Sequence, residues 1–165
     1  MDTFAVLSSV ILHEMGHLFS ALLLGKHLRG IKIMPTGINL SLSAASSYAE
    51  EFLIAAAGPL MNLLYAAFAV CFPIALATAV RETSFVLAFL NLLPLFPLDG
   101  GRMFVAALSF FFGAEIGEKI SSFFSLLFLS FLWILSLYIF FYSGVNFMLL
   151  LFCAYLFSYI VLKKL

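Results

Sequence analysis

The chain of 165 residues is 65% hydrophobic, only 10% of its residues are charged, and its formal net charge is zero. A water-soluble domain carries about 25% charged residues, so this composition excludes a soluble globular protein and indicates an integral membrane protein whose surroundings are the lipid bilayer. A neutral chain also lacks the basic patch that a nucleic-acid partner requires, so no nucleic acid is expected to bind.

Apolar runs are expected at about residues 3–24, 52–80, 84–97, 120–142 and 145–162. Four of them are long enough to cross a hydrocarbon core about 30 Å thick, which takes ~20 helical residues. The third run is short and is interrupted by prolines and glycines. Irregular backbone at membrane depth persists only where it lines a cavity or is buried in protein. The pattern therefore predicts an all-α polytopic membrane protein of about five transmembrane segments, forming one domain over residues 1–165, with a functional pocket at the broken segment.

A short β-hairpin is predicted after the first span. Residues 30–44 read as two alternating runs separated by Pro35, Thr36 and Gly37, which is the pattern of two strands joined by a turn. A hairpin beside an active site could pair with an extended substrate backbone, and a purely structural connector is an equally good interpretation.

The distribution of basic residues predicts the orientation of the chain. Threading the runs alternately across the bilayer leaves Arg81 alone on one side, and the positive-inside rule makes the opposite, crowded side cytoplasmic. The residues on the crowded side are Lys26, Arg29, Lys32, Arg102, Lys119, Lys163 and Lys164. The N-terminus is therefore expected outside and the C-terminus inside a cell membrane. His17 lies nine residues before Lys26, roughly 14 Å along a helix, which places it nearer the cytoplasmic side.

The first run contains the motif His13-Glu14-x-x-His17. Spacing of i and i+4 on a helix directs both imidazoles toward one metal ion, and the carboxylate of Glu14 beside them can act as a general base. Zinc in such a site polarises the scissile carbonyl and activates the attacking water. Polar side chains at membrane depth cost about 2.5–3.5 kcal/mol each on insertion scales, so three of them within five residues indicate a metal site.

A catalytic zinc ion usually takes three protein ligands, so a third is expected elsewhere in the chain. Asp99 lies on the broken third segment, where prolines stop the helix and glycines allow close approach of the backbone, and it is the preferred candidate. Glu51 is the alternative. Glu50 and Glu51 also suit the N-terminus of a helix, because acidic side chains interact favourably with the helix dipole there.

Three ordered motifs resemble those of the site-2 protease family of intramembrane zinc metalloproteases, peptidase family M50. They are His13-Glu14-x-x-His17, Gly58-Pro59-Leu60-Met61-Asn62 and Pro97-Leu98-Asp99-Gly100-Gly101. The resemblance covers a three-helix catalytic core at about residues 5–110, which leaves a C-terminal transmembrane pair at about 120–162.

The resemblance implies zinc bound by His13, His17 and Asp99, with Glu14 catalytic. It also implies that Asn62 and Asn91 lie near the active-site cleft, where either could orient the substrate or the oxyanion. For Asn62, a hydrogen bond to a neighbouring helix is an equally good interpretation, because a polar side chain within an apolar helix needs a partner.

Within the family, the compact core is most similar to the bacterial branch typified by stage IV sporulation protein FB. Members of that branch often carry a membrane span before the first motif and a nucleotide-binding CBS domain after the membrane part, and neither occurs in these residues. The implied function is hydrolysis of peptide bonds in or near transmembrane segments. The implied substrate is a membrane-tethered protein such as a pro-sigma or anti-sigma factor.

Two alternatives use the same residues differently. A membrane metal-ion binding or transport protein could move a cation through the His and Asp ligands, with Glu14 relaying protons, although transporters are typically built from repeated halves and no repeat is visible here. A proteolytically silent relative could only bind membrane partners. Intact His13, Glu14, His17 and Asp99 favour the protease.

Overall fold

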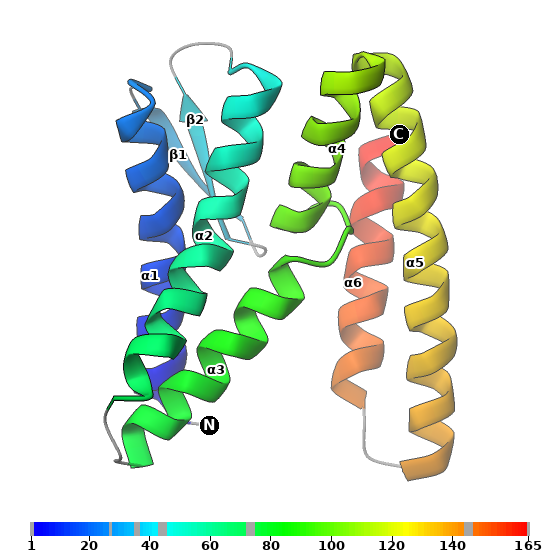
Figure 1. The fold of residues 1–165 in the computed structure, drawn as a ribbon. Helices are drawn as coiled ribbons and strands as arrows, with labels where there is room; N and C mark the ends of the chain where they lie inside the picture. Colours follow the sequence, from blue (N-terminus) through cyan, green and yellow to red (C-terminus); the bar gives the residue numbers. More distant parts are fainter. Residues whose placement is uncertain are drawn as a thin grey trace.

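The computed structural model describes residues 2–26, 28–34, 37–42, 46–71, 75–143 and 147–164. Within them the chain forms six helices and two strands (Figure 1). In chain order these are α1 (Thr3–Leu23), β1 (Leu28–Met34), β2 (Gly37–Leu42), α2 (Tyr48–Ala69), α3 (Ala75–Asn91), α4 (Asp99–Phe112), α5 (Ala114–Ser143) and α6 (Phe147–Lys164).

Helix α2 is the centre of the arrangement, because it packs against α1, α3 and α4. Helix α4 in turn packs against α5, and α6 packs on α5, so the C-terminal helix pair is attached to the rest through α4 and the residues just before it (Figure 1). The chain begins at one end of the bundle and its last helix finishes toward the opposite end. Helices α1 and α4 thus both lie against α2.

Among the residues that the structure describes, three helices have the length and apolar composition to cross a membrane, namely Thr3–Leu23, Tyr48–Ala69 and Ala114–Tyr142. Large apolar side chains such as Phe19 on α1, Phe68 on α2 and Phe141 on α5 lie exposed on the outer surface. Such a surface suits lipid and not water, since a soluble protein rarely exposes large contiguous apolar patches. The expectation of a helical membrane protein is confirmed at this level.

The start of α2 is fixed by its sequence. Ser47 accepts a hydrogen bond from the Glu50 backbone N–H, and the Glu50 carboxylate accepts one from the Ser47 N–H, which together form a capping box. The Glu50 carboxylate also lies 2.9 Å from the ammonium of Lys26, a buried residue just after α1. The interpretation of Glu50 and Glu51 as residues of a helix N-terminus is confirmed, and the pair with Lys26 ties the ends of α1 and α2 together.

An antiparallel strand pair follows α1, in the segment where the hairpin was expected. Ile31 is opposite Leu40 and Met34 is opposite Gly37, with an irregularity in register between Leu28 and Gly30. Residues 35 and 36 of the expected turn lie outside the described residues. Strand β2 packs against α1, the helix that carries the histidine motif.

The boundaries expected for the second and third apolar runs are wrong. The run at 52–80 belongs to two helices, because α2 ends at Ala69 and α3 begins at Ala75. The run at 84–97 is the second half of α3 followed by a turn-rich connector at residues 92–98, and α4 begins only after it. Hydropathy gives no signal at these positions, because apolar residues continue across both helix ends. The structure does place a break in the third segment, as its prolines predict.

Candidate metal centre

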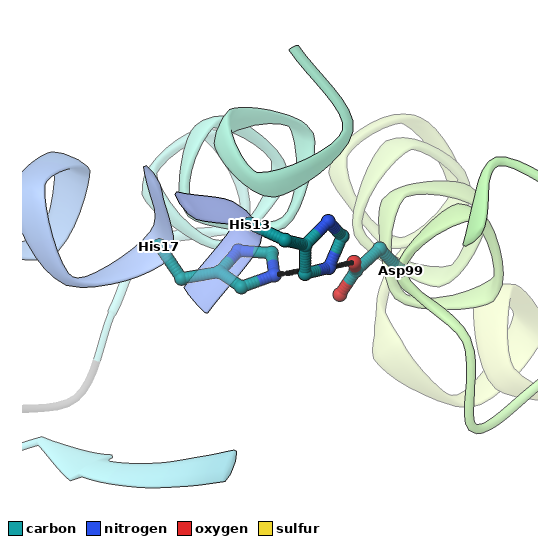
Figure 2. A group of neighbouring side chains, drawn as sticks. All are labelled: His13, His17 and Asp99. Carbon is teal, nitrogen blue, oxygen red and sulfur yellow. Dashed lines mark hydrogen bonds and ion pairs between the residues drawn. The ribbon is translucent and has the colours of Figure 1, made fainter. Parts of the chain in front are cut away.

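Three polar side chains from two distant segments meet beside α2. His13 and His17 project from α1, and Asp99 projects toward them from the first turn of α4 (Figure 2). Asp99 Oδ2 lies 2.9 Å from His13 Nε2 and 3.1 Å from His17 Nε2, and the two Nε2 atoms are 3.2 Å apart. All three residues are buried. The side chains that the sequence assigns to a metal are therefore brought together.

His17 is held in one tautomer by the backbone of α2. Its Nδ1 lies 2.7 Å from the carbonyl oxygen of Ile54. A carbonyl oxygen can only accept a hydrogen bond, so Nδ1 carries a proton, and in the neutral ring Nε2 then keeps its lone pair. This is the state that a histidine needs in order to bind a metal through Nε2.

The dimensions of the group fit a zinc ion. Zinc bonds to nitrogen and oxygen of about 2.0–2.1 Å in tetrahedral geometry put neighbouring ligand atoms about 3.3 Å apart, close to the three distances observed. Asp99 Oδ2 is buried and accepts no hydrogen bond within the described structure, even though two ring nitrogens are near it. A cation shared with the histidines would satisfy this carboxylate oxygen. Among the described residues, His13, His17 and Asp99 are the group that could hold a metal ion.

The start of α4 is built so that Asp99 reaches the histidines. Asp99 occupies the first turn of the helix, where the dipole favours a carboxylate. The next two residues are glycines, and a Cβ on Gly101 would lie 2.6 Å from the backbone of Leu95 and Phe96. Because glycine has no Cβ, the connector can fold back closely against the beginning of the helix. Leu95 and Leu98 of the connector are buried against α5 and α6, which anchors Asp99 from behind.

Glu51, the alternative third ligand, does not join the three converging side chains. Its carboxylate lies 3.7 Å from one guanidinium nitrogen of Arg102, and another nitrogen of Arg102 lies 3.7 Å from Asp99 Oδ1. Arg102 thus stands between the two carboxylates and faces the Asp99 oxygen that points away from the histidines. Glu51 sits in the first turn of α2, where its charge suits the helix terminus.

The three remaining residues that the sequence predicts at the site differ in their burial and in their hydrogen-bond partners. Glu14 is half-buried on α1, one position after His13. Asn62 is fully buried in α2, with its amide nitrogen 3.1 Å from His13 Nδ1. Asn91 ends α3 and donates to the Leu87 carbonyl oxygen of its own helix, at 3.1 Å. The two asparagines therefore have distinct surroundings, and only Asn62 contacts a histidine of the group in the described structure.

Gly58 belongs to the second motif of the sequence, but no role at the site was predicted for it. A Cβ at this position would lie 2.5 Å from His17 Cε1 and 2.9 Å from His13 Cε1, so the backbone of α2 passes directly against both imidazoles. Its spacing of four residues from Asn62 places both on one helix face, a signal that could have linked them to the histidines.

Gly58→Ala is expected to displace both imidazoles and to lower zinc affinity sharply. The added methyl group has no free space, and overpacking of this kind costs typically about 1–3 kcal/mol. Zinc affinity by chelator competition on the purified protein measures the effect. Gly25→Ala is the control for losing a glycine, because no atom of the described residues lies within 4 Å of a Cβ there, although its φ of +71° makes that substitution strained. Equal zinc affinity in Gly58→Ala and wild type would contradict the tight contact.

The fold and the site define a helical membrane protein in which a buried His-His-Asp group is able to hold a metal ion. The family model for Peptidase M50B-like proteins matches residues 3–142, and the chain belongs to this family, the site-2 protease family.

Two relatives show how far the likeness extends. The chain is 29% identical over 104 residues to stage IV sporulation protein FB of Bacillus subtilis, a match that covers 57% of this chain and 35% of that protein. The chain thus spans about a third of that curated relative. The site-2 protease from Methanocaldococcus jannaschii has a similar structure, with a TM-score of 0.71 and 25% identity, covering 94% of this chain and 73% of that one.

Proposed function

We propose that the chain is an intramembrane zinc metalloendopeptidase that hydrolyses peptide bonds in or near the transmembrane segments of membrane-tethered proteins. The observation that carries this proposal is the convergence of His13, His17 and Asp99 from α1 and α4 at distances that suit one zinc ion. Membership of the Peptidase M50B-like family supports the protease over the transport alternative.

In the proposed reaction each residue has one task. His13 and His17 would hold the ion through Nε2, and Asp99 would hold it through Oδ2. A zinc ion in this place supplies Lewis-acid polarisation of the scissile carbonyl and makes water a better nucleophile at neutral pH. Glu14 takes the proton from the attacking water and hands it to the leaving amine. The break between α3 and α4 keeps Asp99 at membrane depth beside α1.

The proposed topology has five crossings of a bacterial cell membrane within a single domain. They are α1, α2, the pair α3 and α4 acting as one broken crossing, α5 and α6. Figure 1 supports this, because α4 continues toward the same end of the bundle as α3, and α5 then returns. The N-terminus lies outside, the C-terminus lies inside, and the metal group is nearer the cytoplasmic end, where Lys26 meets Glu50.

The proposed substrate is a membrane-tethered protein, with pro-sigma and anti-sigma factors as the first candidates because of the likeness to a sporulation protein. A helical segment shields its peptide bonds by internal hydrogen bonds, so the substrate must unwind before it is cut. The strand pair β1 and β2 beside α1 could then receive the extended backbone by strand addition.

Cleavage of tagged single-span substrates, co-expressed with the chain, tests the proposed function. Each substrate is made in two matched forms that differ only at the middle of the span, one with Leu-Leu and the other with Gly-Ser. We expect the wild-type chain to cut the Gly-Ser form faster, because it unwinds more easily. If zinc is bound but no substrate in the panel is cut, zinc flux into vesicles containing the chain would favour the transport alternative.

A further inference from the structure

The second edge of the His13 ring faces a buried amide. Asn62 lies in the middle of α2 and is 0% exposed. Its Nδ2 is 3.1 Å from His13 Nδ1, and its Oδ1 is buried with no hydrogen-bond partner in the described structure. A buried carbonyl oxygen without a partner costs about 1–3 kcal/mol, so an arrangement that gives it one is expected to be preferred.

Metal binding by His13 would supply that partner. A histidine that binds a metal through Nε2 carries its proton on Nδ1 and donates it to a neighbouring acceptor. The two ends of an amide group have nearly the same shape, so a half-turn of the Asn62 amide exchanges Nδ2 and Oδ1 in the same space. After this half-turn Oδ1 faces Nδ1 and accepts a hydrogen bond from its N–H. The same amide thus fits either tautomer of the ring.

Both histidines would then be oriented in the same way, by a hydrogen bond from Nδ1 to an acceptor on α2. His17 donates from Nδ1 to the Ile54 carbonyl oxygen at 2.7 Å, and His13 would donate from Nδ1 to the Asn62 side chain. Both acceptors belong to α2 and lie eight positions apart, so one helix orients both rings while α1 carries them. The only difference is that His17 uses a backbone acceptor, which no substitution removes, whereas His13 depends on a side chain.

We infer that Asn62 is a positioning residue. Its hydrogen bond to Nδ1 of His13 orients the ring so that Nε2 binds the metal, and Asn62 does not contact the substrate or the oxyanion. The inference rests on the proposed function, because it presumes a metal at Nε2. Its basis is that the Asn62 amide is fully buried and faces the edge of the ring opposite to the Nε2 that meets Asp99. This role differs from the substrate contact that the family resemblance implies for Asn62.

Three variants of the full chain, purified in detergent, test this role. Asn62→Leu has nearly the same size and cannot accept a hydrogen bond, whereas the ionised side chain of Asn62→Asp can only accept one. Ser84→Ala is the matched control, since Ser84 is also 0% exposed and its hydrogen bond to Ser9, 2.8 Å long, joins α1 to α3 one helical turn before His13. The readouts are zinc affinity by chelator competition and the visible absorption spectrum of the Co²⁺-substituted protein, which reports the geometry of the metal ligands.

We expect Asn62→Leu to bind zinc about 10- to 100-fold more weakly than wild type, the usual loss when the partner of a metal-binding histidine is removed. Its cobalt spectrum should also change. Asn62→Asp should bind zinc at least as tightly as wild type, and Ser84→Ala should match wild type in both measurements. If Asn62→Leu does not fold, Asn62→Asp decides the matter, because loss of zinc from an acceptor-only variant would overturn the inference.

Two further results would also overturn it. One is wild-type affinity and an unchanged cobalt spectrum in Asn62→Leu. The other is an equal loss in Ser84→Ala, which would indicate a general effect of buried hydrogen bonds on packing. Failure of the proposed metal site is distinct from both, because in that case the wild-type chain itself would bind no zinc. Failure of proteolysis alone is distinct as well, because it would leave zinc binding by the wild-type chain and by these variants unchanged.

Discussion

Glu14→Gln is expected to abolish cleavage while leaving zinc in place. The amide keeps the size of the side chain but cannot take a proton from the attacking water, and a general base contributes typically about 10²–10⁴ in rate. Since Glu14 is not one of the three converging side chains, the metal group keeps all its proposed ligands. Cleavage of the matched single-span substrates, together with the zinc content of the purified variant, measures both halves of this prediction.

Glu115→Gln is the control for Glu14→Gln. Glu115 lies in the first turn of α5, where its exposed carboxylate is 2.7 Å from Lys119. An exposed pair of this kind contributes at most about 1 kcal/mol, so this variant should cut like wild type. Cleavage that persists in Glu14→Gln at the wild-type rate would show that Glu14 is not the base, or that another protease of the host cuts the substrate.

Asp99→Asn is expected to lose zinc and, with it, all cleavage. The substitution removes the charged ligand and leaves two neutral imidazoles, so the loss of affinity should exceed the roughly 100-fold that removal of a ligand's outer partner causes. It also removes a buried negative charge that interacts favourably with the N-terminus of α4. The measurement is metal content per chain after purification, followed by chelator competition on any protein that retains zinc.

Glu51→Gln is the matched comparison, because Glu51 was the alternative third ligand. It should retain zinc, since its carboxylate lies against Arg102 and outside the converging group. Zinc loss in Glu51→Gln together with zinc retention in Asp99→Asn would reverse the two assignments and contradict the site described here.

Much of the fold could be predicted because membrane depth makes composition informative. The scarcity of charged residues indicates helices in lipid, and Pro94 and Pro97 mark the break that the structure places before α4. The separation of α2, which ends at Ala69, from α3, which begins at Ala75, does not follow from apolar composition, although Pro73 lies between them in the sequence. Apolar residues suit lipid whether the chain continues or reverses, so hydropathy does not change there.

The convergence of His13, His17 and Asp99 could be predicted from the sequence, but the contacts that orient these side chains could not. The His13 and His17 spacing fixes one helix face, and Asp99 is distinguished by its broken surroundings. The approach of Gly58 to both rings, the Ile54 carbonyl on His17 and the Asn62 amide on His13 depend on how α2 packs against α1. That packing is a tertiary property, which periodicity within a single helix does not determine.

The zinc content of the purified wild-type chain shows whether His13, His17 and Asp99 hold a zinc ion that serves proteolysis. We expect one zinc ion per chain. A chelator should remove this zinc and abolish cleavage of the single-span substrates, and added zinc should restore both. Wild-type protein that is folded and holds no zinc, even after zinc is supplied, would contradict the account.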